Sequence, residues 1–308
     1  VYDVEVIYNG NENYTSATAN GVFVVKQAPV TVDVEVSDIN VAGKEIINVT
    51  ISNVNATGSV IINVDGVNYT RPIADGKANL TLDKLTNGTH SVVVIYMGDR
   101  NLTGNWTSAT FEVNKFDSEL TINVTDIIVS QKEIIKVNVT EGATGDVIIT
   151  VAGKDYKVEI KNGFATLELD NLANGTYAVH VKYLGDANYS ECEGDASFNV
   201  SKVQSNINLT VSHYGIVANG SDVNITIEAP VDATGKVNVT VFDGVQNKEY
   251  IVYVNDGIGI LHLETPAVGI YHVTAVYLGD GKYIGSENKT GFEVYNTGKE
   301  LTVVTESI

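Results

Sequence analysis

The chain has 308 residues, of which 44% are hydrophobic, and its 38 acidic against 19 basic side chains give a formal net charge of −19. This acidity argues against binding to nucleic acid or to anionic membranes, because both require a cationic surface. The single cysteine excludes an intrachain disulfide framework and a thiolate-based zinc or iron–sulfur site.

The chain opens with a segment that returns three more times. Each copy ends in a tyrosine followed two positions later by glycine: residues 2–8, 90–96, 177–183 and 271–277. The final tyrosines of the copies are 88, 87 and 94 residues apart. The next residue after the glycine is acidic in three copies and asparagine in the first: Asn11, Asp99, Asp186 and Asp280. Four matched copies at this spacing identify an internal repeat.

The repeat divides the chain into three complete units and two fragments. The complete units are residues 28–115, 116–202 and 203–296. We interpret residues 1–27 as the C-terminal hairpin of a preceding repeat and residues 297–308 as the first strand of a following one. The junctions contain no Gly/Pro/Ser-rich linker, so we expect restricted motion between successive repeats.

Inside each repeat, apolar and polar residues alternate with a period of two. Ile47, Val49 and Ile51 share one face of a predicted strand, and residues 135–139 and 223–227 repeat that pattern. About seven such strands, separated by Gly/Asn/Asp turns, fit into each repeat, and no segment keeps a helical period. The pattern predicts an all-β protein made of tandem two-sheet sandwiches without a core disulfide.

The next-to-last strand of the repeat carries a family resemblance. Tyr177 precedes the inward position Val179 by two residues, as the tyrosine of an immunoglobulin tyrosine corner precedes the second core cysteine. The valine and the lack of a tryptophan on the third strand set the chain apart from antibody-type domains. With its Tyr-x-Gly-Asp-x-x-Tyr motif followed by Phe-x-Val, the chain resembles the Ig-like repeats of archaeal, methanogen-type adhesin-like surface proteins. His90 replaces the corner tyrosine in one repeat, and there we expect the phenolic hydrogen bond to be missing.

Asn-x-Ser/Thr sequons are unusually frequent. Solvent-facing strand positions alone would place some Asn and Thr two residues apart, yet the motif is also the acceptor for N-glycosylation on exposed backbone. We expect several of these sites to be glycosylated in the native host. The candidates are Asn13, Asn48, Asn55, Asn68, Asn79, Asn87, Asn101, Asn105, Asn123, Asn138, Asn174, Asn188, Asn199, Asn208, Asn219, Asn224, Asn238 and Asn288.

The aspartates that follow glycine in three copies of the repeat are expected to form turns, since calcium needs six to eight oxygen ligands, usually from several acidic residues. The densest acidic loop is the weak alternative for a calcium site, with Asp186, Glu191, Glu193 and Asp195 as its candidate ligands. No other cofactor is expected. Cys192 lies in the same loop and is interpreted as an incidental free thiol, because neighbouring carboxylates raise a thiol pKa.

No catalytic constellation is visible. The five histidines are scattered among the predicted strands, and no serine or cysteine occupies a nucleophile elbow. We therefore expect no enzyme. Lys44 and Lys132 align as candidates for Lys–Asn isopeptide crosslinks, which occur in some bacterial adhesin Ig-like domains, with solvated edge lysines as the alternative.

The sequence favours structural stalk and adhesion repeats of an extracellular protein at the cell surface or cell wall. Its partners would be neighbouring repeats, copies of itself, or surface glycans and proteins, without direct membrane insertion. One alternative is a subunit of an extracellular filament assembled by strand exchange between Ig-like domains. A second is a carbohydrate-binding module, for which Trp106 is the available aromatic platform.

Overall fold

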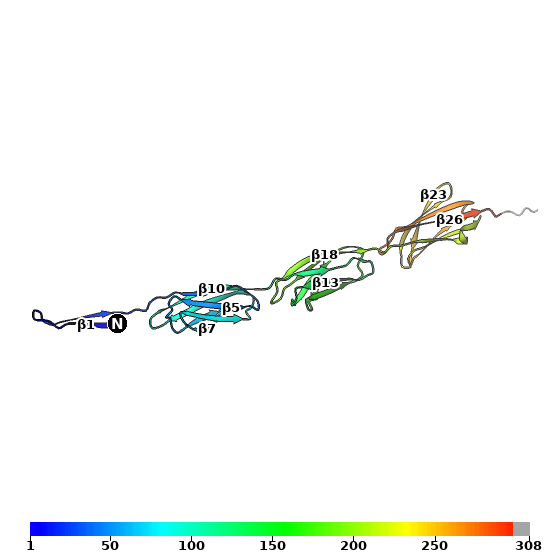
Figure 1. Ribbon diagram of the computed structural model, residues 1–308. Coiled ribbons are helices and arrows are strands. Elements are labelled where there is room, and N and C mark those ends of the chain that lie inside the picture. The colour runs from blue at the N-terminus through cyan, green and yellow to red at the C-terminus, as the bar shows by residue number, and fades with distance from the viewer. Residues whose placement is uncertain (298–308) are drawn as a thin grey trace, which may run out of the picture. The chain divides into compact units, whose positions relative to one another are not determined.

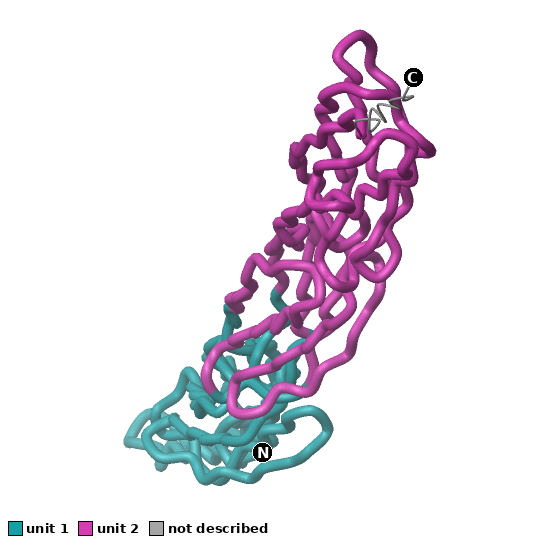
Figure 2. The backbone as a smooth tube through the Cα atoms, turned by 90° about the vertical axis from the view of Figure 1, so that its right-hand side faces the viewer, with its two compact units in different colours: residues 1–119, 142–145, 184–192 teal, residues 120–141, 146–183, 193–308 magenta. Residues whose placement is uncertain are grey.

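The computed structural model of the protein describes residues 1–297. Residues 298–308, which hold nearly all of the predicted strand of a following repeat, lie outside the described residues. The chain forms two compact units, coloured teal and magenta in Figure 2. The first unit comprises residues 1–119, 142–145 and 184–192, so the boundary passes through the second repeat.

The first unit begins with an antiparallel hairpin of β1 (Tyr2–Tyr8) and β2 (Ala17–Phe23). The rings of Tyr2 and Phe23 stack with their centroids 5.2 Å apart. Every residue of both strands is exposed. The alternation that buries one face of the corresponding strands in later repeats leaves apolar side chains in solvent here.

The first unit also contains a complete two-sheet sandwich. Its strands are β3 (Val32–Glu35), β4 (Ile39–Asn40), β5 (Lys44–Ile51), β6 (Ser59–Val64), β7 (Val67–Pro72), β8 (Lys77–Asp83), β9 (Gly88–Gly98) and β10 (Thr103–Asn114). One sheet has the order β3-β5-β8 and the other β4-β10-β9-β6-β7. Figure 1 shows these strands in blue and cyan.

The second repeat, most of which belongs to the second unit, has the same topology. Its strands are β11 (Leu120–Asn123), β12 (Ile127–Ile128), β13 (Glu133–Val139), β14 (Asp146–Val151), β15 (Lys154–Glu159), β16 (Phe164–Leu169), β17 (Gly175–Tyr183) and β18 (Cys192–Ser201). The sheets are β11-β13-β16 and β12-β18-β17-β14-β15.

The third repeat lies within the second unit and adds one short 3₁₀ turn. Its elements are β19 (Asn208–Val211), η1 (Ser212–Gly215), β20 (Ile216–Ala218), β21 (Val223–Glu228), β22 (Gly235–Phe242), β23 (Asn247–Val254), β24 (Ile258–Leu263), β25 (Gly269–Tyr277) and β26 (Ser286–Tyr295). The sheets are β19-β21-β24 and β20-β26-β25-β22-β23.

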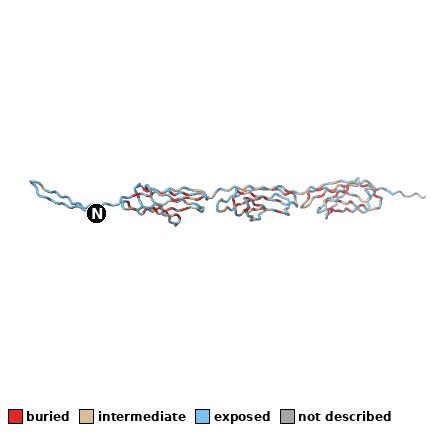
Figure 3. Tube along the Cα trace, turned by 60° about the horizontal axis from the view of Figure 1, so that its bottom comes forward, coloured by how far each residue is buried: buried red, intermediate tan, exposed pale blue. Residues whose placement is uncertain are grey.

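The predicted period of two explains how each sandwich forms. Ile47, Val49 and Ile51 are at most 2% exposed, and they face Val60 and Ile62 of the opposite sheet, which are fully buried. Figure 3 shows buried positions along the strands of each sandwich and exposed positions along the whole N-terminal hairpin. Burying such β-branched side chains contributes about 1.5–3 kcal/mol each. The prediction of tandem Ig-like β-sandwiches without a disulfide is confirmed, and the only cysteine is free.

The first strand of each repeat is split between the two sheets. In the first repeat β3 pairs antiparallel with β5, and β4 then crosses to pair parallel with β10, Ile39 lying opposite Val113. β12 and β20 pair with β18 and β26 in the same parallel way. The beginning and the end of every repeat therefore lie side by side in one sheet.

The tyrosine corner is formed in the two repeats that retain the tyrosine. Tyr177 donates its hydroxyl hydrogen to the carbonyl of Ala173 at 3.0 Å, and Tyr271 makes the same bond four residues back. In the first repeat the phenol is absent, as expected, but the corner bond is not lost. The His90 Nε2 atom lies 2.8 Å from the carbonyl oxygen of Thr86, also four residues back.

Candidate functional site: a clasp at the start of each repeat

The repeated Gly-Asp turn connects the last two strands of each repeat and holds the chain where the repeat begins. Its glycines have positive φ, for example +87° at Gly98, and a Cβ at Gly98 would lie only 2.7 Å from backbone atoms of Leu102 and Gly104. Only glycine fits this turn without strain. We use the name clasp for three residues together: the aspartate of this turn, the threonine that it contacts, and the residue that directly precedes the repeat.

In the second repeat both carboxylate oxygens of Asp186 accept hydrogen bonds. Oδ1 accepts the backbone N–H groups of Asn188 and Tyr189, each at 2.8 Å, which closes the turn. Oδ2 accepts the backbone N–H of Thr144 at 2.8 Å and its hydroxyl at 2.7 Å. The side chain thus ties the last hairpin to the loop that precedes β14.

The backbone carbonyl of the same aspartate anchors the entering chain. Lys115 Nζ donates to the carbonyl of Asp186 at 2.5 Å, and the next residue, Phe116, donates its backbone N–H to Asn188 at 2.8 Å. The Phe116 carbonyl accepts the N–H of Ser190 at 2.9 Å. The start of the repeat is therefore held by side-chain and backbone bonds together.

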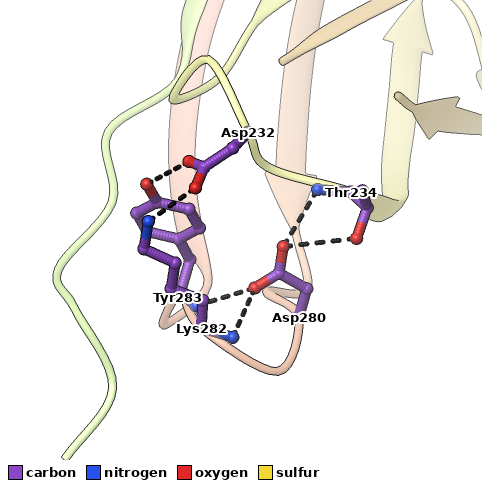
Figure 4. Close-up of polar contacts among 5 residues, drawn as sticks. All are labelled: Asp232, Thr234, Asp280, Lys282 and Tyr283. Atoms are coloured by element: carbon purple, nitrogen blue, oxygen red, sulfur yellow. Dashed lines mark hydrogen bonds and ion pairs between the residues drawn. The ribbon is translucent and has the colours of Figure 1, made fainter. Parts of the chain in front are cut away.

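The third repeat reproduces this arrangement and extends it, as Figure 4 shows. Asp280 accepts the backbone N–H groups of Lys282 and Tyr283 at 2.8 and 2.7 Å, and that of Thr234 at 2.9 Å. Asp232 adds a second carboxylate, which contacts Lys282 Nζ and the Tyr283 hydroxyl at 2.5 Å each. Here the entering residue is a lysine again, and Lys202 Nζ donates to the carbonyl of Asp280.

The first repeat has the same bonds with one change of side chain. Asp99 accepts the N–H groups of Asn101 and Leu102, and its other oxygen accepts the N–H and hydroxyl of Thr57. Gln27 takes the place of the lysine and donates Nε2 to the Asp99 carbonyl at 2.5 Å. In the N-terminal hairpin, the Asn11 side chain keeps the turn-closing half, accepting two backbone N–H groups at 3.0 Å.

These hydrogen bonds favour the charged carboxylates. Burial alone would raise the pKa of Asp186, but the bonds from Thr144, Asn188 and Tyr189 outweigh it and lower the pKa to about 2. At Asp99, the N–H of Asn101 is the largest cause and lowers the pKa of the carboxyl well below its usual range. The clasps therefore stay ionised at neutral pH, and charge-assisted bonds of this kind are stronger than neutral ones.

The acidic residues suggested for calcium occupy different places. Asp186 is used by the clasp, whereas Asp195 lies on β18 with its carboxylate 2.9 Å from His180 Nδ1. Glu193 lies on the far side of the same imidazole, 4.0 Å from Nε2. Within residues 1–297, no group of three or more His, Cys, Asp or Glu side chains is arranged to hold a metal ion. The geometry adds no support to the calcium expectation.

The glycosylation candidates lie almost entirely on the surface, and only Asn138 and Asn288 are half-buried. Asn48 and Asn79 face each other directly across β5 and β8. Four candidates use the atom that would carry a glycan. Asn105 Nδ2 donates to the Val30 carbonyl at 2.8 Å and Asn288 Nδ2 to the Ile207 carbonyl at 2.7 Å, while Asn208 and Asn199 donate Nδ2 to carboxylates at 3.2 and 3.4 Å. The remaining exposed sequons stay as predictions.

The other singled-out residues do not assemble into a site. Cys192 is half-buried at the start of β18, and Trp106 lies on β10 with 64% of its surface exposed. Lys44 and Lys132 are both exposed, and Lys132 Nζ contacts Glu168 at 3.4 Å. Among the described residues no helix is long and apolar enough to cross a membrane.

The threonine of the clasp was not identified from the sequence, although a signal was present. Thr57, Thr144 and Thr234 each stand in an Ala-Thr-Gly tripeptide, 42, 42 and 46 residues before the clasp aspartate. Two buried carboxylates were also missed. Glu45 and Glu133 are 1% exposed and accept the backbone N–H of the residue eight positions earlier, at the point where the first strand changes sheets.

No family model matches the chain, and no curated protein matches it. Among solved structures, the chain is similar to part of a 1.5-MDa bacterial ice-binding adhesin, with 14% identity, a TM-score of 0.34, and coverage of 88% of this chain and 100% of that one. Domains A168–A170 of titin are 11% identical to the chain, with a TM-score of 0.34 and coverage of 86% of this chain and 99% of that one. Sidekick-1 immunoglobulin domains 1–5 are 13% identical to the chain, with a TM-score of 0.32 and coverage of 94% of this chain and 65% of that one.

Proposed function

We propose that the chain is a load-bearing segment of an extracellular, adhesin-like surface protein of an archaeon, and that its repeats present a distal region away from the cell. The observation that carries the proposal is the clasp, which recurs with the same hydrogen bonds in all three repeats. Because the same hydrogen bonds occur at the same place in successive repeats, we infer that they serve a role that all of the repeats share. Resistance to tension along the chain is such a role.

The strand topology supports a mechanical role. Force applied at the two ends of a repeat pulls β12 and β18 in opposite directions, because these parallel neighbours are its first and last strands. Hydrogen bonds that lie across the strands are then loaded together, in shear, instead of one after another. The clasp adds the bonds of Lys115 and Phe116 at the entry to the same repeat.

The junctions leave little slack. Asn114, the last residue of β10, accepts the N–H of Val41, and Phe116 is already bonded to Asn188 in the next repeat. Only Lys115 lies between them, and its side chain is held by Asp186. The second junction repeats this pattern. A linker of one residue, itself anchored, gives a load path without a flexible spacer.

The solvent-facing surface of the repeats is acidic and rich in sequons. A net charge of −19 over repeated solvent faces opposes association of like molecules. Exposed sequons on those faces would add glycans, whose bulk and polarity protect extended surfaces from proteolysis. Both properties suit an extracellular position, at the cell surface or in the cell wall.

A filament subunit is the second candidate, and the exposed hairpin favours it. Val4, Val6 and Tyr8 on β1 are 40–62% exposed, although the matching positions of later repeats are buried. Strands of another molecule could cover them. Size-exclusion chromatography with negative-stain imaging of this 308-residue chain separates the two functions. We expect monomeric, unbranched particles over a wide concentration range, whereas regular polymers would contradict the stalk and support strand exchange.

A further inference from the structure

The third repeat departs from the other two at one end of its sandwich. The hairpin of β22 and β23 has eight residues in each strand, whereas the corresponding β14 and β15 have six each. The longer hairpin extends beyond the core and faces the loop that follows β24. The third repeat therefore differs from the other two in structure at this end.

A cavity of about 370 Å³ lies between the extended hairpin and this loop. Tyr250 and Tyr271 supply ring surface, and the polar lining includes Asp243, Lys248, His262 and Glu264. A volume of this size falls at the lower end of the range for small-molecule sites. The floor is rigid, because Tyr271 belongs to the tyrosine corner and is only 7% exposed.

Some of the polar groups in the cavity are engaged and others are available. Asp243 Oδ1 accepts the N–H groups of Val245 and Gln246, which fixes the hairpin turn, and its other oxygen lies 3.8 Å from Lys248 Nζ. In contrast, no hydrogen-bond partner is found among residues 1–297 for the Tyr250 hydroxyl or the Glu264 carboxylate. The cavity thus offers a ligand the Tyr250 hydroxyl, which can donate and accept, and the Glu264 carboxylate, which can accept. The ammonium group of Lys248 lines the same cavity.

A strained turn is connected to the same cavity. In η1, His213 and Tyr214 both have left-handed φ values, 59° and 52°, and Tyr214 is fully exposed. Ser212 in this turn accepts the N–H of Asn224 at 3.1 Å, and Asn224 Oδ1 lies 2.7 Å from Nδ1 of His262, which lines the cavity. Left-handed φ values are disfavoured for residues other than glycine.

We propose that this cavity binds a neutral saccharide residue. Sugar hydroxyls both donate and accept, which matches the mixture of Glu264, Tyr250 and Lys248, and the apolar face of a pyranose ring matches a tyrosine ring. The two carboxylates of Asp243 and Glu264, set against the single ammonium group of Lys248, disfavour an anionic ligand. The binding site lies on residues different from Trp106 and is independent of the load-bearing function.

The test is titration of the whole chain with the methyl glycosides of glucose, galactose, mannose and N-acetylglucosamine, followed by ¹H–¹⁵N NMR shifts. We expect at least one glycoside to shift resonances of the β22–β23 hairpin and of residues 262–267. Glu264→Gln should weaken that binding by about tenfold, as expected for loss of a charged hydrogen bond. Tyr250→Ala should abolish it.

Matched controls keep the result interpretable. Tyr156 takes the same inward place in the second repeat, since it lies opposite Ile149 as Tyr250 lies opposite Val239. Tyr156→Ala should leave binding unchanged, and Glu264 is exposed, so that its substitution should not unfold the repeat. No shift with any glycoside at 50-fold excess over the protein would overturn the proposal. So would shifts that survive Glu264→Gln at full strength, or binding of methylammonium ion at this cavity in place of the glycosides.

Discussion

On β9, the His90 ring occupies the corner position with hydrogen-bond acceptors on both sides. Nε2 faces the Thr86 carbonyl at 2.8 Å and Nδ1 faces the Asp65 carboxylate at 2.6 Å. Neither partner can donate, so both ring nitrogens must carry hydrogen, and the imidazole is charged. The His90 ring stacks on Phe111 with the ring centroids 5.2 Å apart, as Tyr177 stacks on Phe198 in the second repeat.

This charged histidine makes the stability of the first repeat depend on pH. Burial alone would lower the pKa of His90, but the Thr86 carbonyl, the Asp65 carboxylate and the more distant Glu112 together raise it above 6.5. Burial likewise opposes the lowered pKa of Asp65, which the bonds from Ser91 and His90 produce.

The two pKa shifts affect the stability of the first repeat in different pH ranges. A raised histidine pKa stabilises the fold fully below about pH 6.5, and that contribution is lost as the pH rises through the folded pKa. The lowered carboxyl pKa stabilises the fold above about pH 4, and that contribution is lost in more acidic solution. We expect calorimetry of the chain to show one transition moving to lower temperature between pH 6.5 and 9.

The substitution His90→Tyr tests the cause. It restores the side chain of the other corners and should flatten the pH dependence of that transition above pH 6.5, because tyrosine does not titrate there. The transitions of the other two repeats serve as internal controls. A slope that persists in His90→Tyr would show that other groups produce it.

At the scale of single elements, the Gly-Asp turn can be tested with two glycines of equal backbone conformation. Gly98 and Gly66 both have φ of +87°, but a Cβ meets nothing within 4 Å at Gly66 and meets Leu102 and Gly104 backbone at 2.7 Å at Gly98. Gly66→Ala should cost about 1–2 kcal/mol, the left-handed penalty alone. Gly98→Ala should cost clearly more, measured by urea unfolding of the first repeat's transition, and equal costs would refute the steric account of the turn.

Much of each element could be predicted from its residues. The period of two identified the buried face of β5, and the spacing of Tyr96, Tyr183 and Tyr277 identified the repeat. Only one part of the clasp, the Gly-Asp turn, could be predicted from the sequence. The Gly-Asp pair is a local turn signal, whereas Thr144 is 42 residues from Asp186 and is brought to it by the antiparallel pairing of β14 with β17 in one sheet.

Two further features depend on tertiary structure in the same way. His90 departs from the tyrosine pattern, and only the tertiary structure shows that its Nε2 keeps the corner bond to the Thr86 carbonyl and that its Nδ1 faces Asp65. The β22–β23 hairpin, residues 235–254, is six residues longer than its counterpart, residues 146–159. The sequence shows this difference in length, but only the tertiary structure places the loop after β24 beside the hairpin to form the cavity.

At the scale of the molecule, the same clasp appears three times with different entering residues. Gln27 and Lys115 donate to the same carbonyl position, and Lys202 does so in the third repeat. A neutral amide and two lysine side chains make the same contact, so what recurs is the bond to the carbonyl and not a particular charge. This invariance fits repeats that all carry the same load.

The central claim is that the clasp bears force, and single-molecule stretching of the whole chain from its two ends tests it most directly. We expect three unfolding events, one for each repeat, and expect Asp186→Asn to lower the force of one of them, since an amide nitrogen cannot accept the Thr144 N–H. Asp117→Asn, at an exposed position of the same repeat that makes no such bonds, should leave all three forces unchanged. Unaltered forces in Asp186→Asn would contradict the account.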